Sequence, residues 1–147
     1  MEVEVIKIIK KRIPLPLSKI RVYTFKVLKL LKIKTGSINI VLADDAFIRK
    51  LNRQFLKRDY PTDVLAFREV EGKNKKNYSL SGEIVISLDT AKRFAKEYGK
   101  RIEDEVCLYL IHGLLHLMGY DDRTLKERKK MEELQDSIFY KIKQDEK

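Results

Sequence analysis

Two histidines one helical turn apart are the residues of this chain whose type and spacing could do chemistry. They are His112 and His116, and the 147-residue chain has no other histidine. On a helix, positions i and i+4 share one face, so both imidazoles can reach the same metal ion. Asp122 follows six residues after His116, beyond Gly119, which is well placed to end the helix and let the chain turn back. Three protein ligands and a bound water form the open coordination of a catalytic zinc site.

We therefore predict one metal site made of His112, His116 and Asp122. Imidazole ligands suit zinc, nickel or iron, and the availability of the metal rather than the geometry can decide between them. Asp121 is the alternative third ligand, and either aspartate can instead be a turn residue. The single cysteine, Cys107, lies five residues before His112 and on another face of the helix, so we interpret it as a small core residue.

The residue after the first histidine bears on the kind of hydrolysis. In zinc proteases of the His-Glu-x-x-His type, this position holds the glutamate general base. Here it is Gly113, which argues against proteolysis by that mechanism. Water bound to the metal would then be activated mostly by the metal, or by a base from elsewhere in the chain.

The charge balance favours a polyanionic partner. Lys and Arg number 32 and Asp and Glu 22, so the net charge is +10. This excess attracts nucleic acid, although a lysine-rich solubilising surface has the same composition. No apolar run approaches the roughly 18 residues of a membrane span. The first residues show no signal-peptide pattern, and one cysteine excludes an internal disulfide framework. We expect a soluble intracellular protein with a single domain over residues 1–147.

The hydrophobic pattern predicts the elements that must position these side chains. Strands are expected near 3–8, 38–42, 62–67 and 83–87, and helices near 18–34, 44–55, 89–98, 102–118 and from 124 onward. The order β-α-β-α-β-β-α-α-α indicates an α/β fold of the α+β type, with one mixed, mostly four-stranded sheet packed against about five helices. Ser18, Asp44 or Asp45, Asp89 and Thr124 are the expected helix N-caps.

The fourth helix is expected to be the buried centre of the fold. Its residues 106–117 are apolar nearly all round, which is typical of a helix covered on every side. Since His112 and His116 belong to this segment, the metal site is predicted to lie on the central helix.

The same segment resembles the signature of a known family. Residues 112–121, HGLLHLMGYD, are similar to the signature of the bacterial ribosomal RNA maturation factor YbeY, a family of metal-dependent endoribonucleases. Two upstream segments agree in order and spacing. They are Leu51-Asn52 followed by DYPTDVLAF at 59–67, and GEIVIS at 82–87. The resemblance covers about residues 46–123.

The resemblance implies a small α/β protein with one zinc ion that cuts single-stranded RNA. The implied role is maturation of small-subunit (16S) ribosomal RNA and ribosome quality control in the cytoplasm. The implied partners are single-stranded and ribosomal RNA and the small ribosomal subunit or its proteins. Neither DNA nor a membrane is expected as a partner.

Two positions depart from the family pattern. The family usually has a third histidine where this chain has Asp122, and a carboxylate neutralises part of the metal's charge, so a bound water should be less acidified. The family also commonly has an arginine, thought to face the substrate phosphate, where this chain has Leu56. Lys57 and Arg58 are the candidates to replace it. We therefore assign His112, His116, Lys57 and Arg58 as catalytic candidates, although a solvated helix end explains the two basic residues equally well.

The resulting hypothesis is hydrolysis of RNA at the zinc ion, with basic residues holding the phosphate backbone. Tyr60 or Tyr120 could stack on a base, and Thr62 and Asp63 could line the cleft, although packing also explains these residues. Two alternatives stay open. One is a zinc metallopeptidase-like enzyme, and the other is a non-catalytic ribosome-assembly factor whose metal is structural.

Overall fold

The computed structural model describes residues 1–56, 63–69 and 79–146. Four residues of the sequence hypotheses, Lys57, Arg58, Tyr60 and Thr62, lie outside the described residues. The backbone of Leu56 is described as the last residue of a helical segment.

The observed elements follow the predicted order. The strands are β1 (Glu2–Lys7), β2 (Ser37–Ala43), β3 (Val64–Arg68) and β4 (Gly82–Ser87). The helices are α1 (Leu17–Leu30), α2 (Asp45–Leu51), α3 (Leu88–Glu97), α4 (Ile102–Leu117) and α5 (Leu125–Asp145). A π-helical turn, η1 (Asn52–Leu56), continues α2 directly. The predicted α+β class is confirmed.

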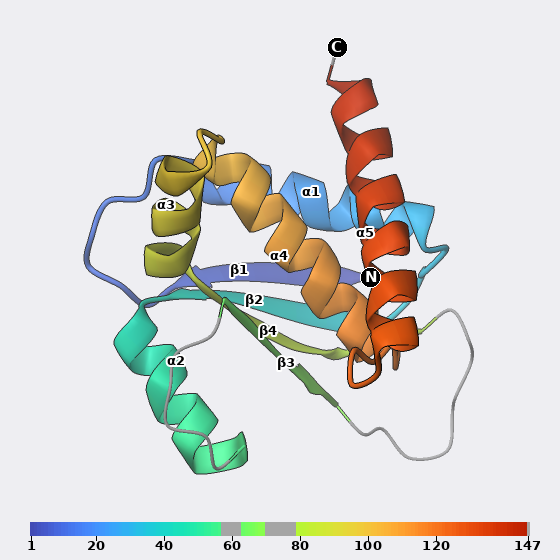
Figure 1. Ribbon diagram of the computed structural model, residues 1–147, viewed down its shortest axis with the longest axis horizontal. Helices are drawn as coiled ribbons and strands as arrows, with labels where there is room; N and C mark the ends of the chain where they lie inside the picture. The colour runs from blue at the N-terminus through green and yellow to red at the C-terminus, as the bar shows by residue number, and fades with distance from the viewer. Residues whose placement is uncertain (57–62, 70–78, 147) are drawn as a thin grey trace.

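The four strands form one mixed sheet in the order β1-β2-β4-β3 (Figure 1). β1 pairs with β2 and β2 with β4 in parallel, while β3 runs antiparallel to β4 along one edge. The parallel pairs are joined through helices, as crossover connections require. The mixed sheet expected from the sequence is therefore present.

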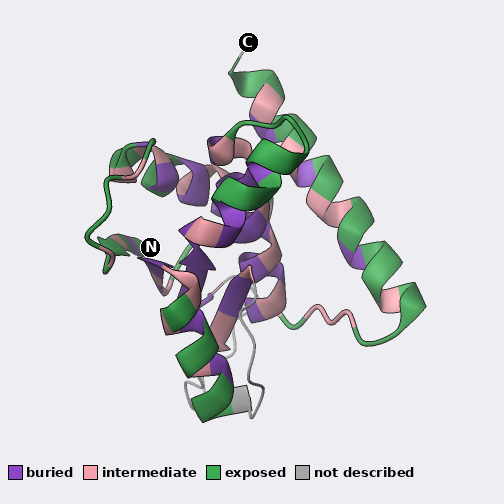
Figure 2. Ribbon diagram, turned by 60° about the vertical axis from the view of Figure 1, so that its left-hand side comes forward, coloured by how far each residue is buried: buried purple, intermediate pink, exposed green. Residues whose placement is uncertain are grey.

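The main core lies between one face of the sheet and helices α1, α3, α4 and α5. Alternate strand residues point into it, including Ile38, Ile40 and Leu42 of β2 and Ile84 and Ile86 of β4. Figure 1 shows α4 crossing this face between α3 and α5, and Figure 2 shows buried residues gathered on the sheet and on the helix faces turned toward it. Eleven residues of α4 are buried, which confirms it as the central helix.

A smaller core covers the opposite face of the sheet. Side chains of neighbouring strand residues point to opposite faces of a sheet, and Val41, Leu65 and Val85 point away from the main core. They pack with Ile48 of α2. This packing fixes α2 and therefore the start of η1, where Asn52 is almost completely buried.

Two predicted helix caps are wrong. Pro16 stands at the N-cap of α1 and no side chain caps that end, because the helix already begins at Leu17, one residue before Ser18. In α3 the cap is Ser87, whose hydroxyl accepts from the Thr90 N–H, so Asp89 lies inside the first turn. The predicted caps of the second and fifth helices are confirmed, with Asp44 accepting from Phe47 and Thr124 from Glu127.

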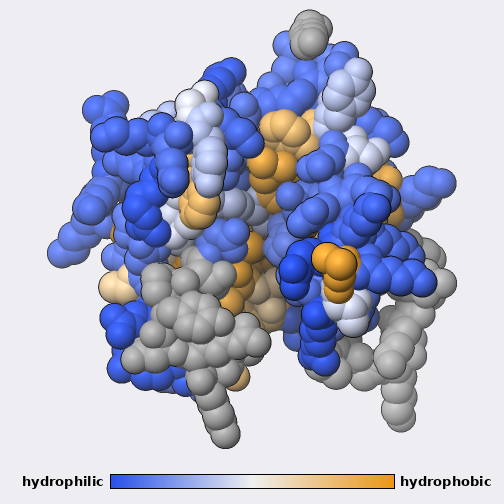
Figure 3. Space-filling model, viewed as in Figure 1, coloured by the Kyte–Doolittle hydropathy of each residue, from blue (hydrophilic) through white to orange (hydrophobic). Residues whose placement is uncertain are grey.

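Polar contacts hold the end of α5 against the rest of the molecule. The Tyr23 hydroxyl donates to Glu146 at 2.8 Å, and Lys143 forms ion pairs with Glu146 and with Asp104 of α4. Figure 3 shows that the face seen in Figure 1 is mostly hydrophilic. Among the described residues, no helix combines the length and the apolar content needed to cross a membrane.

Candidate metal centre

Helix α4 brings the two histidines together near its C-terminal end. The Nε2 atoms of His112 and His116 lie 3.0 Å apart. The helix ends at Leu117, and two residues later Gly119 has a φ of +101°, a left-handed conformation that favours glycine. The Gly119 N–H donates to the His116 carbonyl and the Tyr120 N–H to the Leu115 carbonyl, the bonds of a Schellman motif. This reversal returns the chain toward the histidine face.

Asp122 completes the group. Its Oδ2 atom lies 3.8 Å from Nε2 of His112 and 3.7 Å from Nε2 of His116. Within the described part of the chain, these three residues are the cluster of histidine, cysteine or acidic side chains that could hold a metal ion, with ligand atoms within 4.8 Å of one another. The structure therefore brings together the three residues predicted from the sequence.

The competing aspartate has other partners. Asp121 accepts the Asp122 N–H through Oδ1 at 2.8 Å and pairs with Arg123 through Oδ2 at 3.1 Å. It thus serves as a turn residue after α4. This arrangement favours Asp122 over Asp121 as the third ligand.

The hydrogen bonds behind the two imidazoles set their tautomers. His112 Nδ1 lies 2.9 Å from the side-chain oxygen of Gln135 on α5, and His116 Nδ1 lies 3.0 Å from the Tyr120 carbonyl. Both oxygens are acceptors, so each Nδ1 carries the proton and donates it. Both Nε2 atoms then turn a lone pair toward the centre of the cluster, as histidine ligands of metals do.

This donor set fits a zinc ion. Zn–N bonds of about 2.0–2.1 Å in a tetrahedron place two ligand atoms about 3.3 Å apart. The observed separations of 3.0, 3.7 and 3.8 Å lie on either side of that value. A single cation could accept the lone pairs of both Nε2 atoms and one oxygen of the Asp122 carboxylate.

The surroundings of His116 favour its neutral form. Burial, together with the neighbouring His112, lowers the pKa of His116 below its ordinary value, and Asp122 opposes this shift only in part. A neutral imidazole is the form that binds a metal. His116 is therefore held in the form that a metal ligand requires near neutral pH.

Gly113 has a packing role. A Cβ atom at this position would lie 2.8 Å from Cγ2 of Ile84, a closer contact than real Cβ atoms make. The glycine thus lets α4 lie close to β4. A glutamate here would face the sheet instead of the histidine face, so the structure offers no place at this position for the general base of a His-Glu-x-x-His protease.

A cavity of about 660 Å³ opens in front of the cluster. Strand β3, the loop after α4 and Asn52 form its wall. Asp63, predicted to line the cleft, and Tyr120, predicted as a candidate for base stacking, are among the residues that line it. The cavity is large enough for a ligand of nucleotide size.

Other sequence interpretations concern residues outside the cluster. Cys107 is buried in the main core, as predicted. Burial raises the pKa of its thiol to about 12, so the thiol is unreactive near neutral pH. The sequence analysis missed Gln135, Asn52 and the Tyr120 carbonyl. Gln135 is 23 positions from His112, and no local spacing links the two. For Asn52, the Leu51-Asn52 motif was the available signal.

The fold and the site together define an α+β protein with a candidate three-ligand metal centre at the mouth of a cavity. The chain matches the family model described as "Endoribonuclease YbeY" over residues 6–143. The endoribonuclease YbeY of Persephonella marina is 45% identical over 119 residues, which cover 80% of this chain and 78% of the relative. That of Aquifex aeolicus is 37% identical over 126 residues, covering 85% and 83%. This chain belongs to the YbeY endoribonuclease family.

The fold likeness extends over nearly the whole chain. A Thermotoga maritima protein whose solution structure is known matches with a TM-score of 0.60 and 24% identity. The match covers 97% of this chain and 93% of the other. At this identity the likeness supports the α+β fold alone.

Proposed function

We propose that this protein is a zinc-dependent endoribonuclease that cuts single-stranded RNA during maturation of small-subunit ribosomal RNA in the cytoplasm. Membership of the YbeY family supports an endoribonuclease. The observation that carries the metal-dependent mechanism is the convergence of His112, His116 and Asp122 at the mouth of a cavity. The ribosome or its small subunit is the proposed assembly that presents the RNA.

The three residues of the cluster would hold the ion. A bound zinc ion supplies Lewis acidity toward a phosphoryl oxygen of the substrate. The Gln135 side chain and the Tyr120 carbonyl turn the two imidazoles so that each Nε2 faces the ion, and burial favours the neutral form of His116. The Asp122 carboxylate lowers the net charge of the site relative to a third imidazole.

The residues around the cavity suit an RNA strand. Arg123 is the basic residue among those that line the cavity, and its side chain is 85% exposed. It pairs with Asp121 through Nε, and its other guanidinium N–H groups could donate to a phosphate. Half-buried Tyr120 lines the same cavity and is our candidate for stacking on a base. Lys57 and Arg58 follow directly after η1 in the sequence, and we keep them as proposed phosphate contacts in place of the arginine usual in the family.

RNA cleavage by the metal-free and zinc-restored protein is the direct test. Chelator-stripped protein is incubated with a single-stranded RNA oligonucleotide before and after zinc is added. We expect cleavage only with zinc, and none with His116→Ala or Asp122→Asn. Asp136→Asn, which makes the same change at an exposed position of α5, should cleave like the wild type.

The same experiment separates the alternatives. Cleavage that persists in His116→Ala would contradict the proposed site. Tight zinc binding without cleavage would indicate an assembly factor with a structural metal. Turnover of a peptide substrate that disappears in His116→Ala would instead support a peptidase.

Salt dependence tests the proposed RNA contacts. On single strands, log affinity should fall against log salt with a slope of about −0.7 for each neutralised phosphate. Arg123→Ala should reduce the size of this slope by about one such contact. A flat response for the wild-type protein would contradict binding through the phosphate backbone.

A further inference from the structure

A second cavity lies away from the candidate metal centre. Its volume is about 950 Å³, and it opens where α1 ends and where β1 and β2 begin. It shares no lining residue with the cavity in front of the histidines. None of the proposed steps of RNA cleavage uses it.

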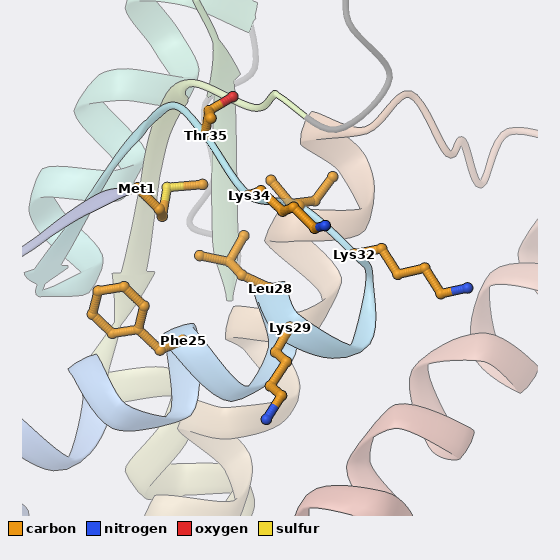
Figure 4. Close-up of a pocket in the computed structure, with 8 residues that line it drawn as sticks. Met1, Phe25, Leu28, Lys29, Lys32, Lys34 and Thr35 are labelled. Carbon is orange, nitrogen blue, oxygen red and sulfur yellow. The ribbon is translucent and has the colours of Figure 1, made fainter.

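The floor of this cavity is built by the end of α1. Lys32 has a φ of +60°, its N–H donates to the Lys29 carbonyl, and the Ile33 N–H donates to the Leu28 carbonyl. These are the two bonds of a Schellman motif, which commonly brings two apolar side chains together. Those side chains are Leu28 and Ile33, and Figure 4 shows Met1, Phe25 and Leu28 directed toward the same space. The result is an apolar floor.

The rim is positively charged. Lys29, Lys32 and Lys34 are exposed and line the cavity, and Figure 4 shows the Lys29 and Lys32 side chains extending away from α1. Within the part of the chain that the structure describes, none of these three lysines forms an ion pair. Lys32 also occupies a left-handed position where glycine would be less strained. Lys32 thus places a cationic side chain at a position whose backbone conformation favours glycine.

An RNA strand does not match this combination. Sequence-tolerant RNA grooves use exposed aromatic faces on which bases stack. Here the aromatic lining residue is Phe25, and the Arg21 guanidinium lies over its ring at 5.0 Å. The rest of the floor is aliphatic or thioether. A second copy of this chain is also a poor partner, because each copy carries a net charge of +10.

We propose that this cavity is a docking site for an acidic segment of a partner protein that inserts one or two large apolar side chains between Lys29, Lys32 and Lys34. The apolar side chains would pack against the half-buried Met1 and Phe25, above the buried Leu28 and Ile33. The partner's carboxylates would supply the opposite charges that the three lysines lack. The site is independent of the metal centre and does not require the proposed ribonuclease activity.

The test is binding of a fluorescein-labelled 12-residue peptide that carries one Phe and one Leu among aspartates. The matched peptide has Ala in place of both apolar residues. Binding is measured by anisotropy, and the contact surface by amide chemical shifts in ¹⁵N-labelled protein. The charge-reversed variant carries Lys29→Glu, Lys32→Glu and Lys34→Glu. Its control carries Lys126→Glu, Lys129→Glu and Lys130→Glu, the same change of charge at exposed positions of α5.

We expect saturable binding with shifts at residues 25–35 and none at Gly113. The rim variant and the Ala peptide should each bind at least about tenfold more weakly, while the α5 control binds normally. Lys32→Gly should weaken binding without lowering the melting temperature, because it removes a charge and relieves backbone strain. This variant keeps the test valid if the triple variant does not fold.

Three outcomes would overturn the proposal. The first is the absence of peptide binding at millimolar concentration. The second is equal binding of the Ala peptide or equal weakening by the α5 control, which would mean unspecific attraction to a basic protein. The third is displacement of the peptide by a single-stranded RNA that shifts the same amides, which would assign the cavity to RNA.

Discussion

The Nδ1 atom of His112 lies 2.9 Å from Oε1 of Gln135, a residue of a different helix. Because an amide oxygen only accepts, this contact fixes the proton on Nδ1 and leaves Nε2 free to face His116 and Asp122. Helix α5 therefore contributes to the candidate metal centre through the orientation of His112. Gln135 is a positioning residue of the site.

Gln135→Ala should weaken zinc binding by about 10–100-fold, the usual effect of removing such an outer partner. The affinity is measured by competition with a chromogenic chelator, so the result does not depend on RNA cleavage. Gln135→Glu should retain the affinity, since a carboxylate also accepts from Nδ1. Gln144→Ala makes the same truncation at an exposed position of α5 and should have no effect. Unchanged affinity in Gln135→Ala would contradict the positioning role.

Asp122→His should shift the activity profile toward lower pH. If Asp122 holds the proposed ion, its carboxylate would neutralise part of the ion's charge, whereas a third imidazole would not, so water at the site would ionise more readily in the variant. We expect the acidic limb of the pH–rate profile to move down by about one unit, with zinc still bound. The measurement is initial cleavage rate against pH at saturating zinc. A profile that moves upward would show that Asp122 does not lower the charge of the site.

Gly113→Ala should destabilise the protein by about 1–3 kcal/mol although alanine favours helices. The added methyl group would meet Ile84 at 2.8 Å and push α4 away from β4. Denaturant unfolding measures the loss. Combined with Ile84→Ala, the same change should cost less than the two single changes together, because the methyl enters the space that Ile84 vacates. Additive losses would rule out this contact as the cause.

Asp45→Asn should lower stability at neutral pH and matter less in acid. Burial by itself would raise the Asp45 pKa, but hydrogen bonds from Ser87, Arg93 and Thr90 outweigh it and hold the pKa below the ordinary 3.8. The stabilisation by the ionised group is therefore complete above about pH 4 and is lost as the pH falls through the lower folded value.

Urea unfolding at several pH values checks this prediction. We expect a loss of about 1–3 kcal/mol at pH 7, the typical contribution of hydrogen bonds to a charged group, and a smaller loss near pH 3. Asp136→Asn, on the exposed face of α5, is the control and should change little at either pH. A loss for Asp45→Asn that grows toward acid would reverse the sign argued here.

Much of the fold followed from short-range patterns. Short apolar segments at 38–42 and 83–87 predicted β2 and β4, and the nearly continuous apolar run at 106–117 predicted the central position of α4. The two misplaced caps, Ser18 and Asp89, show where such patterns fail. A capping residue is defined by the first helical dihedral angles, and packing against the rest of the protein sets where these begin.

The candidate metal centre also combines features set by the local sequence with features set by tertiary contacts. The sequence alone determined that His112 and His116 share a helix face, because helical periodicity is a local property, and that Gly119 can turn the chain so that Asp122 returns. Only the tertiary structure decided which aspartate faces the histidines, that Gln135 orients His112, and that β3 and Asn52 close the cavity. Those contacts join residues far apart in the chain or depend on the path of a loop, and they exist only once the helices have packed on the sheet.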